Sequence, residues 1–465
     1  MDEPTPPATD EPELDLAPVL PPPPPRDRRI RRRLRIAVAL TLLAAVVVLG
    51  VLQRTGAFNF RGGPASSPAR LAIIDDNGAL TTTDGRGGSV VPYAVPGFTF
   101  QFPAWSPDGT RIAAIGSGPS GVGSIDVFTA RSSGTGETDP PIIYQSADQP
   151  PFYLYWRPDS KAVTFLTSQP TDIALRIAPA DGSNTDAIVR HGSPLYWDFA
   201  DHDRLLVHIG VAGADAFLGE VDLAGATKES AVIAPGGFRA PLISNDYRDR
   251  AYVATGDGSS GTLVLEARDG SGRHTTPVLG LTALGFNPSG TNVAFLAPRT
   301  AQDQIIGFPI GQLRLLDSGT GDVRTLRDGS VVAFFWAPDG KTIAVLELNA
   351  AGGGGVASTT AVRAVFAPLA AASPSPGAGL HLLFVDVATG AIRSERQVRL
   401  SGLFLTQLLP FFDQYALSHR VWSADGGSIV LPLVGDGGAN QIFVIGADGS
   451  GFNRVAAGTT AFWSP

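Results

Sequence analysis

Short apolar segments separated by polar turns recur along the chain from about residue 70 to its end. Segments of this length that are rich in Val, Ile, Leu and Phe are typical of buried β-strands, and clusters of Pro, Asp, Asn and Gly between them predict tight turns. The pattern therefore predicts an all-β fold for residues 70–465. The expected strands include Ile112–Ile115, Val163–Leu166, Val293–Leu296, Ile343–Leu346 and Ile429–Leu433.

The strands and turns form a repeated unit that begins with an aromatic residue. In Trp105-Ser-Pro-Asp-Gly109 the proline presets φ, the aspartate bonds back to the backbone and the glycine accepts a positive φ, which together predict a tight turn. All six tryptophans occupy the same place in this unit. The residues that we assign to the repeat are Trp105, Trp156, Trp197, Trp336, Trp422 and Trp463, with the turn aspartates Asp108, Asp159, Asp339 and Asp425.

Four antiparallel strands per unit predict the blade of a β-propeller. Full units begin at residues 105, 156, 197, 243, 286, 336 and 422, and the longest interval contains a Gly/Ala-rich insertion, residues 350–379, that we expect to be a mobile loop. Residues 70–93 lack the tryptophan strand, whereas the C-terminal Phe462–Pro465 supplies only that strand. If the two ends pair in one split closing blade, the fold is an eight-bladed propeller; if they do not, seven blades are the alternative.

The Trp-[Ser/Ala]-Pro-Asp-Gly-x-x-Ile-Ala unit, clearest after Trp105 and Trp336, resembles the repeat of TolB-type, WD40-like propellers (the PD40 repeat). The resemblance covers about residues 70–465. It implies the fold and an extracytoplasmic protein that binds other proteins across a face of the ring, often without catalysis of its own. Unlike that family, this chain has a membrane anchor, more blades and no recognisable extra N-terminal globular domain, so no partner identity is implied.

The first 69 residues differ from the rest. Residues 1–35 form a Pro-rich acidic tail that ends in an arginine cluster, and residues 36–53 are apolar enough to predict a transmembrane signal anchor, followed by a flexible linker at 54–69. Seven arginines before the span against two just after it predict a cytoplasmic N-terminus and an extracytoplasmic propeller in the cell membrane. A cleaved signal peptide is the alternative, but the long apolar run favours an uncleaved anchor. The favoured interpretation of Pro21–Pro25 is a solvated spacer, and the alternative is a ligand for a cytoplasmic partner.

Composition narrows the chemistry. The chain of 465 residues has no cysteine, which excludes disulfides, thiolate metal sites and cysteine nucleophiles. Residues 1–52 are neutral, so the whole net charge of −8 belongs to the remainder, and a net-acidic body argues against a nucleic-acid partner. The 55 glycines and 38 prolines disfavour a helical bundle and fit a fold that is rich in turns.

No motif for catalysis, a metal or a cofactor is evident. The chain has no G-x-S-x-G, H-E-x-x-H or phosphate-binding loop, and its histidines are scattered except for His202 and His208, which lack a third ligand nearby. Asp75-Asp-Asn-Gly78 fits a hairpin turn better than a calcium loop, because no distal acidic residue follows it. We therefore expect no catalytic residue, metal or cofactor.

The segment Leu400–Leu417 is too long and too apolar to be a plain connection between two strands. If it is exposed, it offers a surface for a partner. The favoured alternative is that it folds over the ring and caps the channel. The six residues of the partner-binding hypothesis are Leu403, Phe404, Leu408, Phe411, Phe412 and Tyr415.

These observations predict a membrane-tethered, non-catalytic platform that binds a protein or a cell-envelope polymer. An enzyme with its site in the central funnel is an alternative, although the inner-strand segments Phe100–Phe102, Phe152–Tyr155 and Val332–Phe335 are mainly apolar and disfavour catalysis. A sensor that binds a ligand in the funnel and is coupled to the Pro-rich tail is a further alternative.

Overall fold

A computed structural model describes residues 69–465, apart from 211–215, 233, 256–259, 301–307 and 349–379. The predicted tail, membrane span, linker and insertion (1–35, 36–53, 54–69 and 350–379) lie outside the described residues, except for residue 69. None of the helices in the described part is both long and apolar enough to cross a bilayer. The described strands all belong to one compact unit.

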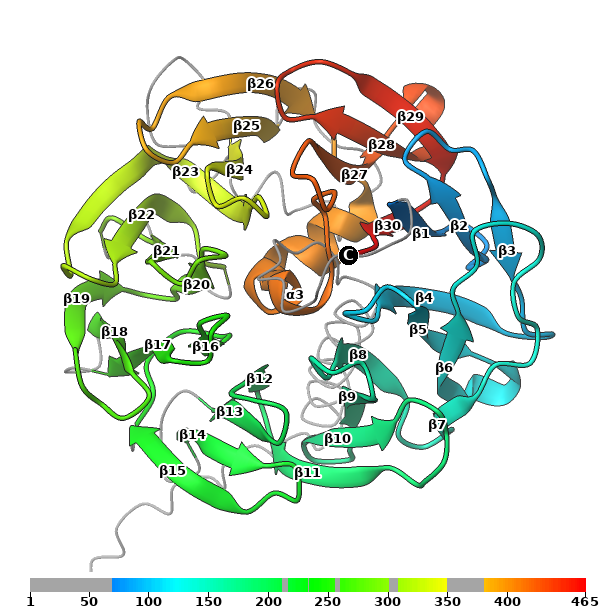
Figure 1. The fold of residues 1–465 in the computed structure, drawn as a ribbon, viewed down its shortest axis with the longest axis horizontal. Coiled ribbons are helices and arrows are strands. Elements are labelled where there is room, and N and C mark those ends of the chain that lie inside the picture. The colour runs from blue at the N-terminus through cyan, green and yellow to red at the C-terminus, as the bar shows by residue number, and fades with distance from the viewer. Residues whose placement is uncertain (1–68, 211–215, 233, 256–259, 301–307, 349–379) are drawn as a thin grey trace, which may run out of the picture. The chain divides into compact units, whose positions relative to one another are not determined.

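Antiparallel sheets surround a common centre, as Figure 1 shows, and the described part of the chain is an all-β propeller. Two four-stranded sheets follow one another along the chain, formed by β4 (Thr99–Trp105), β5 (Arg111–Ser117), β6 (Gly123–Thr129) and β7 (Ile142–Ser146), and by β8 (Pro151–Trp156), β9 (Ala162–Ser168), β10 (Ile173–Pro179) and β11 (Ala187–Gly192). Two more contain β12 (Leu195–Phe199), β13 (Arg204–Ile209), β14 (Phe217–Asp222) and β15 (Thr227–Val232), and β16 (Leu242–Ile243), β17 (Asp249–Thr255), β18 (Ser260–Ala267) and β19 (His274–Leu279).

The remaining sheets differ in size. A seven-stranded sheet contains β20 (Ala283–Phe286), β21 (Asn292–Ala297), β22 (Gly311–Asp317), β23 (Val323–Trp336), β24 (Thr342–Leu348), β25 (Leu380–Asp386) and β26 (Ile392–Val398). The long strand β23 pairs with β22 through residues 323–331 and with β24 through residues 331–336, so it belongs to two successive groups of strands. A three-stranded sheet contains β27 (Ser428–Val434), β28 (Asn440–Gly446) and β29 (Phe452–Ala457), and Trp422 is bridged to Ile429 on its inner side.

The predicted turn chemistry is confirmed at the first repeat. The N–H of Gly109 donates to the carbonyl of Ser106 at 2.9 Å, and Asp108 Oδ1 accepts from the N–H of Thr110 at 3.0 Å. Gly109 has a φ of +72°, a conformation that costs glycine little and most other residues much more. The tryptophan at the end of the inner strand is thereby followed directly by the next antiparallel strand.

The repeated tryptophans hold neighbouring sheets together through their indole N–H groups. Trp156 Nε1 donates to the carbonyl of Ala104 at 2.9 Å, and Ala104 directly precedes the tryptophan of the sheet before. Trp336 and Trp422 make the equivalent bonds to Gly285 and Phe335, each at 3.0 Å. Trp105 bonds in the same way to Phe462 at 3.2 Å, whereas Trp197 reaches Thr164 Oγ1 at 3.1 Å, and this hydroxyl donates onward to Tyr155 O.

The two chain ends share one sheet, in the order β3 (Val91–Tyr93), β2 (Leu80–Asp84), β1 (Arg70–Ile74) and β30 (Thr460–Trp463). The ladder runs from Leu71 opposite Trp463 to Ile74 opposite Thr460. Ser464 extends it, because its N–H donates to Arg70 O at 2.7 Å and its Oγ accepts from Arg70 N at 3.0 Å. The predicted pairing of the ends is confirmed, and it makes β30 the inner strand of this sheet, so β1 is not left as its edge.

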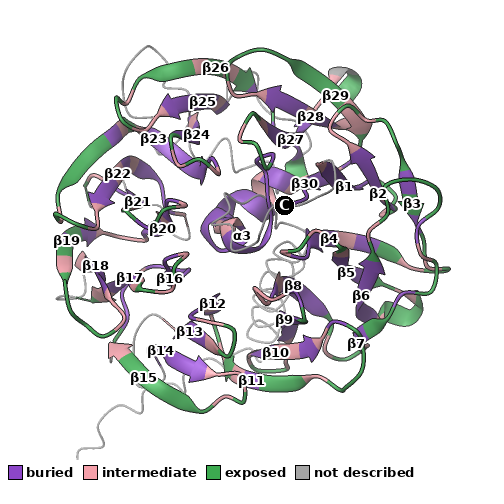
Figure 2. Cartoon of the chain, in the orientation of Figure 1, coloured by how far each residue is buried: buried purple, intermediate pink, exposed green. Residues whose placement is uncertain are grey.

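Burial falls from the inner strands to the outer ones (Figure 2). Buried ion pairs also bridge neighbouring sheets. Arg268 donates from Nε and Nη2 to the two carboxylate oxygens of Glu220, at 2.7 and 2.6 Å, and from Nη1 to Ala200 O at 2.9 Å. The Glu220 side chain is 2% exposed, so this bidentate contact satisfies a charge that has little access to water.

Candidate functional site

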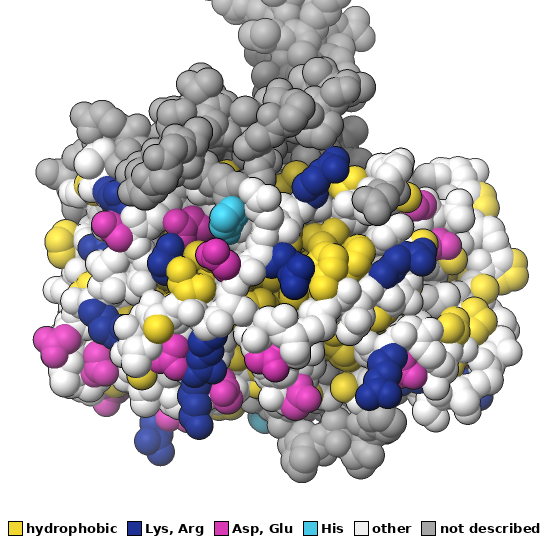
Figure 3. All heavy atoms as spheres, turned by 90° about the horizontal axis from the view of Figure 1, so that it is seen from above, with side chains coloured by type: hydrophobic (Ala, Val, Ile, Leu, Met, Phe, Trp, Pro, Cys, Tyr) yellow, Lys and Arg dark blue, Asp and Glu magenta, His cyan; other side chains and the backbone are white. Residues whose placement is uncertain are grey.

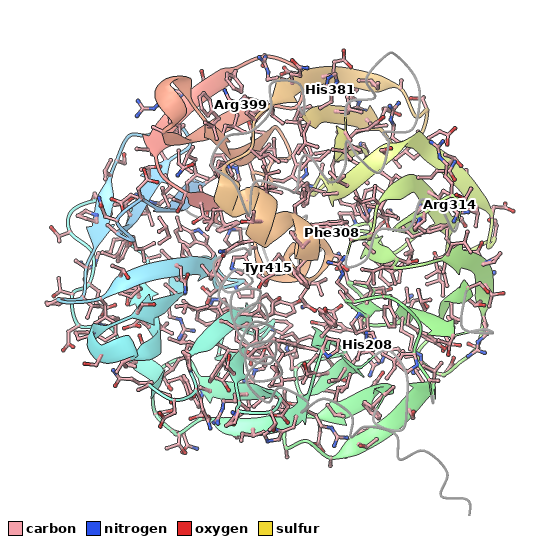
Figure 4. All side chains as sticks on the ribbon, turned by 180° about the vertical axis from the view of Figure 1, so that it is seen from behind. His208, Phe308, Arg314, His381, Arg399 and Tyr415 are labelled. Atoms are coloured by element: carbon pink, nitrogen blue, oxygen red, sulfur yellow. The ribbon has the colours of Figure 1, made fainter. Side chains whose placement is uncertain are left out.

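A helical segment lies at the centre of the ring. It consists of η4 (Phe404–Leu408), η5 (Leu409–Phe411) and α3 (Phe412–Ser418), which we call the plug. Figure 1 shows α3 surrounded by the sheets, and Figure 4 shows Tyr415 near the middle of the ring. Helix α3 contacts the inner strands β8, β12, β20 and β23. The plug therefore fills the space in which the open funnel of a propeller would lie.

Aromatic packing holds the plug in the ring. Phe412 meets Phe334 edge-on, with ring centroids 5.2 Å apart, and Tyr415 meets Tyr153 at 4.6 Å. The packing agrees with the capping alternative and places four residues of the partner-binding hypothesis out of reach of a partner while the plug is in place. Phe404, Leu408, Phe412 and Tyr415 are at most 1% exposed, and Leu403 and Phe411 are half-buried.

Polar side chains within the same segment fix the orientation of α3. Gln414 Nε2 donates to Tyr153 OH and to Trp197 O, each at 3.1 Å, and so ties the helix to β8 and β12. The Tyr153 hydroxyl in turn donates to Ser418 Oγ at 2.9 Å. Burial raises the pKa of Tyr153, so this hydroxyl remains a donor at any physiological pH.

A buried Asp–Arg pair lies at the other end of α3. Asp413 Oδ1 is 4.0 Å from Arg239 Nη1, and both side chains are at most 3% exposed. Burial raises the pKa of Asp413, and the guanidinium of Arg239 and nearby backbone N–H groups oppose that rise. His208 Nδ1 lies 2.9 Å from Arg239 O, and burial lowers the pKa of His208 to about 4, so its ring is neutral at pH 7 and donates from Nδ1. The sequence interpretation missed this cluster, although an Asp-Gln pair inside an apolar run was its visible signal.

A pocket of about 520 Å³, including the space at its mouth, lies beside the C-terminal end of α3. Its wall combines the end of the plug, the turns after β4 and β8, and the chain's C-terminus. Successive turns contact one another on this side of the ring: the N–H of Asp108 donates to Ser160 Oγ at 3.1 Å, and Asn245 Nδ2 donates to Pro288 O at 2.6 Å. We call this side the turn face and the cavity the turn-face pocket. Its lining residues are Trp105, Ser106, Pro107, Tyr155, Trp156, Pro158, Leu417, Ser418, His419, Arg420, Phe462, Trp463 and Pro465.

The pocket wall carries a few polar groups among aromatic rings, a composition typical of ligand sites. Ser418 Oγ and His419 Nδ1 are hydrogen-bonded at 2.6 Å, and Arg420 Nη1 approaches Ser464 O at 3.4 Å. Burial lowers the pKa of Arg420, yet a guanidinium keeps its charge at neutral pH. Trp463 Nε1 has no hydrogen-bond partner among the described residues, unlike the other five indole N–H groups of the repeat.

The other predicted residues are structural where they are described. Asp108, Asp159, Asp339 and Asp425 all accept backbone N–H groups within their turns. Asp75 Oδ1 accepts from the N–H groups of Asn77 and Ala79, each at 2.8 Å, as expected of a turn. Within the part of the chain that the structure describes, no group of three or more His, Asp or Glu side chains is placed to hold a metal ion.

No family model matches the sequence, and no curated protein matches it either. Several solved structures are similar in fold. TolB from Acinetobacter baumannii has 17% identity over 77% of this chain and 67% of that chain, with a TM-score of 0.38. Citrobacter koseri AztD has 14% identity over 85% and 96%, with a TM-score of 0.44, and an oligogalacturonate lyase in complex with manganese has 12% over 84% and 85%, with a TM-score of 0.41. These likenesses concern the fold alone.

Proposed function

We propose that this chain is a membrane-tethered, extracytoplasmic propeller that binds another protein on its turn face and performs no chemistry of its own. The tether and its direction rest on the apolar span 36–53 and the arginines before it. The binding role rests on the faces of the propeller ring, which offer a surface for a partner. The resemblance of the repeat motif to TolB-type propellers points in the same direction.

The observation that carries the proposal is the combination of a filled centre and an aromatic pocket beside it. The plug occupies the funnel with buried side chains such as Phe412 and Tyr415, so a large partner is met by the faces and the rim of the ring. On the turn face, the pocket offers aromatic walls and a buried cation, Arg420, which suit a protruding apolar side chain next to an acidic or carbonyl group.

We also infer that the ring has eight blades. The two halves of β23 count as the outer strand of one blade and the inner strand of the next, and Trp422 supplies a short inner strand for β27–β29. A ring with many blades has a wide centre, and this width accounts for a plug made of whole helical turns rather than single side chains.

The test compares two matched prolines of the repeated turns. Pro158 lines the pocket, whereas Pro338 holds the equivalent position after Trp336, and both are half-buried. Full-length wild-type protein, Pro158→Trp and Pro338→Trp are used as bait in detergent extracts of the native cells. The proposal expects one protein that binds the wild type and Pro338→Trp and is lost with Pro158→Trp, because the new indole fills the pocket.

An enzyme or a small-molecule sensor remains the alternative function. If native mass spectrometry finds a bound small molecule in place of any protein partner, and Pro158→Trp displaces it, the platform proposal is refuted. Retention of the same partner by all three baits also counts against the turn-face pocket as its site.

A further inference from the structure

We propose that the outer surface of β26 and β29 binds an acidic segment of a partner protein, independently of the turn-face pocket. The two strands belong to neighbouring sheets and lie next to each other at the top of Figure 1. Ser394 Oγ, on β26, donates to Ala447 O, in the turn before β29, at 3.0 Å. This bond fixes the spacing of the two strands, so their side chains form one continuous surface.

An exposed aromatic stack lies on this surface. Phe452 is 39% exposed, which is unusual for so large an apolar side chain in an otherwise well-buried chain. Its ring stacks on Phe443 with centroids 4.4 Å apart and planes at 23°, and Arg396 Cζ lies 4.6 Å from the Phe452 centroid. The stack is a preordered anchor of the two residue classes, aromatic and arginine, that are enriched at protein interfaces.

Unpaired positive charge surrounds the stack. Residues 392–399 and 452–457 contain four arginines and a single acid, Glu395, although the body of the chain is net acidic. Arg393 pairs with Asp386, but the side chains of the other three arginines form no ion pair with any described residue. Arg396, over the Phe452 ring, and Arg454, two residues along β29 from Phe452, together with Phe443 and Phe452, are called the Arg–Phe patch. Figure 3 looks onto this side of the ring and shows hydrophobic side chains flanked by Lys and Arg.

The shape of the surface favours an extended segment over a flat anionic layer. Both β26 and β29 are end strands of their sheets among the described residues, so a chain in extended conformation can lie along their open backbone edges. Alternate side chains of such a segment point the same way, so acids at every second position can meet the arginines. Asp386, the last residue of β25, and Asp448, in the turn before β29, would oppose the approach of a flat anionic bilayer.

Fluorescence anisotropy of the full-length protein in detergent micelles tests the proposal. The probe is a labelled peptide of alternating Glu and Phe, and the comparison probe has Gln in place of every Glu. The acidic peptide is expected to bind, with an affinity that falls as salt is added, whereas the Gln peptide is not. Arg396→Gln and Arg454→Gln are each expected to weaken binding about tenfold, the equivalent of one charge-assisted hydrogen bond.

Arg190→Gln is the matched control. Arg190 lies on another outer strand, β11, and also covers a phenylalanine, Phe217, at 5.3 Å, but it is outside the Arg–Phe patch. This variant and Pro158→Trp should both bind the acidic peptide like the wild type. Because Pro158→Trp fills the turn-face pocket, its unchanged binding would show that the peptide does not bind there. Equal binding of the Gln peptide, unchanged affinity in the Arg396→Gln/Arg454→Gln double variant, or tighter binding of the protein to phosphatidylglycerol vesicles than to the peptide would each overturn the proposal.

Discussion

Asp126 makes the stability of the propeller depend on pH in a direction opposite to that of most carboxylates. It lies on β6, is fully buried, and accepts a hydrogen bond from Ser124 Oγ at 2.5 Å, while its Oδ1 has no partner among the described residues. Burial raises the pKa of Asp126 from 3.8 to about 6, and the single bond from Ser124 only partly opposes the rise. The folded state therefore holds this proton more tightly than the unfolded chain does.

The sign and size of the effect follow from linkage. Because the folded pKa is the higher one, the stabilisation is complete below pH 3.8 and is lost as the pH rises through about 6. A shift of roughly two pKa units corresponds to about 3 kcal/mol of lost stability above pH 7. Asp126→Asn keeps a similar shape and a partner for Ser124 but carries no charge, so it should be more stable than the wild type by up to about 3 kcal/mol at pH 8 and by close to nothing at pH 4.

Urea unfolding of the full-length protein and of Asp126→Asn at several pH values between 4 and 8 measures this difference. Asp139→Asn, at an exposed carboxylate of a loop, is the control and should change stability by less than about 0.5 kcal/mol at each pH. A difference between wild type and Asp126→Asn that stays constant from pH 4 to pH 8 would show that Asp126 is not the titrating group and would refute the reasoning.

Three further predictions concern contacts between sheets. Trp156→Phe should lower the free energy of unfolding, measured with denaturant, by about 1–2 kcal/mol more than Trp463→Phe does. Both variants replace an indole by a smaller ring, but only Trp156→Phe also loses an indole hydrogen bond, because Trp463 Nε1 has no partner among the described residues. Arg268→Met should lower stability by about 2 kcal/mol, because Glu220 then keeps only Arg204, at 3.2 Å, as its charged partner. Adding Glu220→Gln should recover part of that loss, and no recovery would argue against the ion pair as the cause. Deletion of residues 460–465 removes β30, so it should abolish the single cooperative transition in calorimetry, and a variant that still melts as one unit would contradict closure through the chain ends.

Much of the fold was legible in the sequence because its determinants are local. Turns such as Trp105–Gly109 use residues whose backbone preferences act over a few positions, and the strands that they join alternate with them along the chain. The pairing of β1 with β30 was predictable, because the N-terminal strands lacked the tryptophan strand of the repeat and the C-terminus supplied only that strand. The hydrogen bonds from the indole N–H groups to neighbouring sheets could not be predicted, because the acceptor of Trp156 lies 52 residues away in the sequence, at Ala104.

The candidate site was less predictable than the fold. The apolar run Leu400–Leu417 indicated either an exposed surface or a cap, and hydrophobicity alone does not distinguish the two. The distinction lies in partners that are remote in sequence, such as Tyr153, which is 261 residues from Gln414. Asp413 likewise contacts a residue that is remote in sequence, Arg239. The turn-face pocket could not be predicted for the same reason, since its wall combines two separate turns and the end of the plug with the chain end.

The plug also constrains how a ligand signal could pass through the ring. Helix α3 joins the buried pair Asp413–Arg239 at one end to the pocket residues Ser418 and His419 at the other, over seven residues, Phe412–Ser418. A helix this short moves as one body, so a ligand that displaces Ser418 must also strain the contact between Asp413 and Arg239. Because both side chains are at most 3% exposed, separating them would leave the Asp413 carboxyl group farther from the nearby guanidinium with no water to replace it, which is unfavourable. Binding in the pocket is therefore expected to leave the plug in place, and a partner would be recognised by a rigid surface rather than by an opening of the channel.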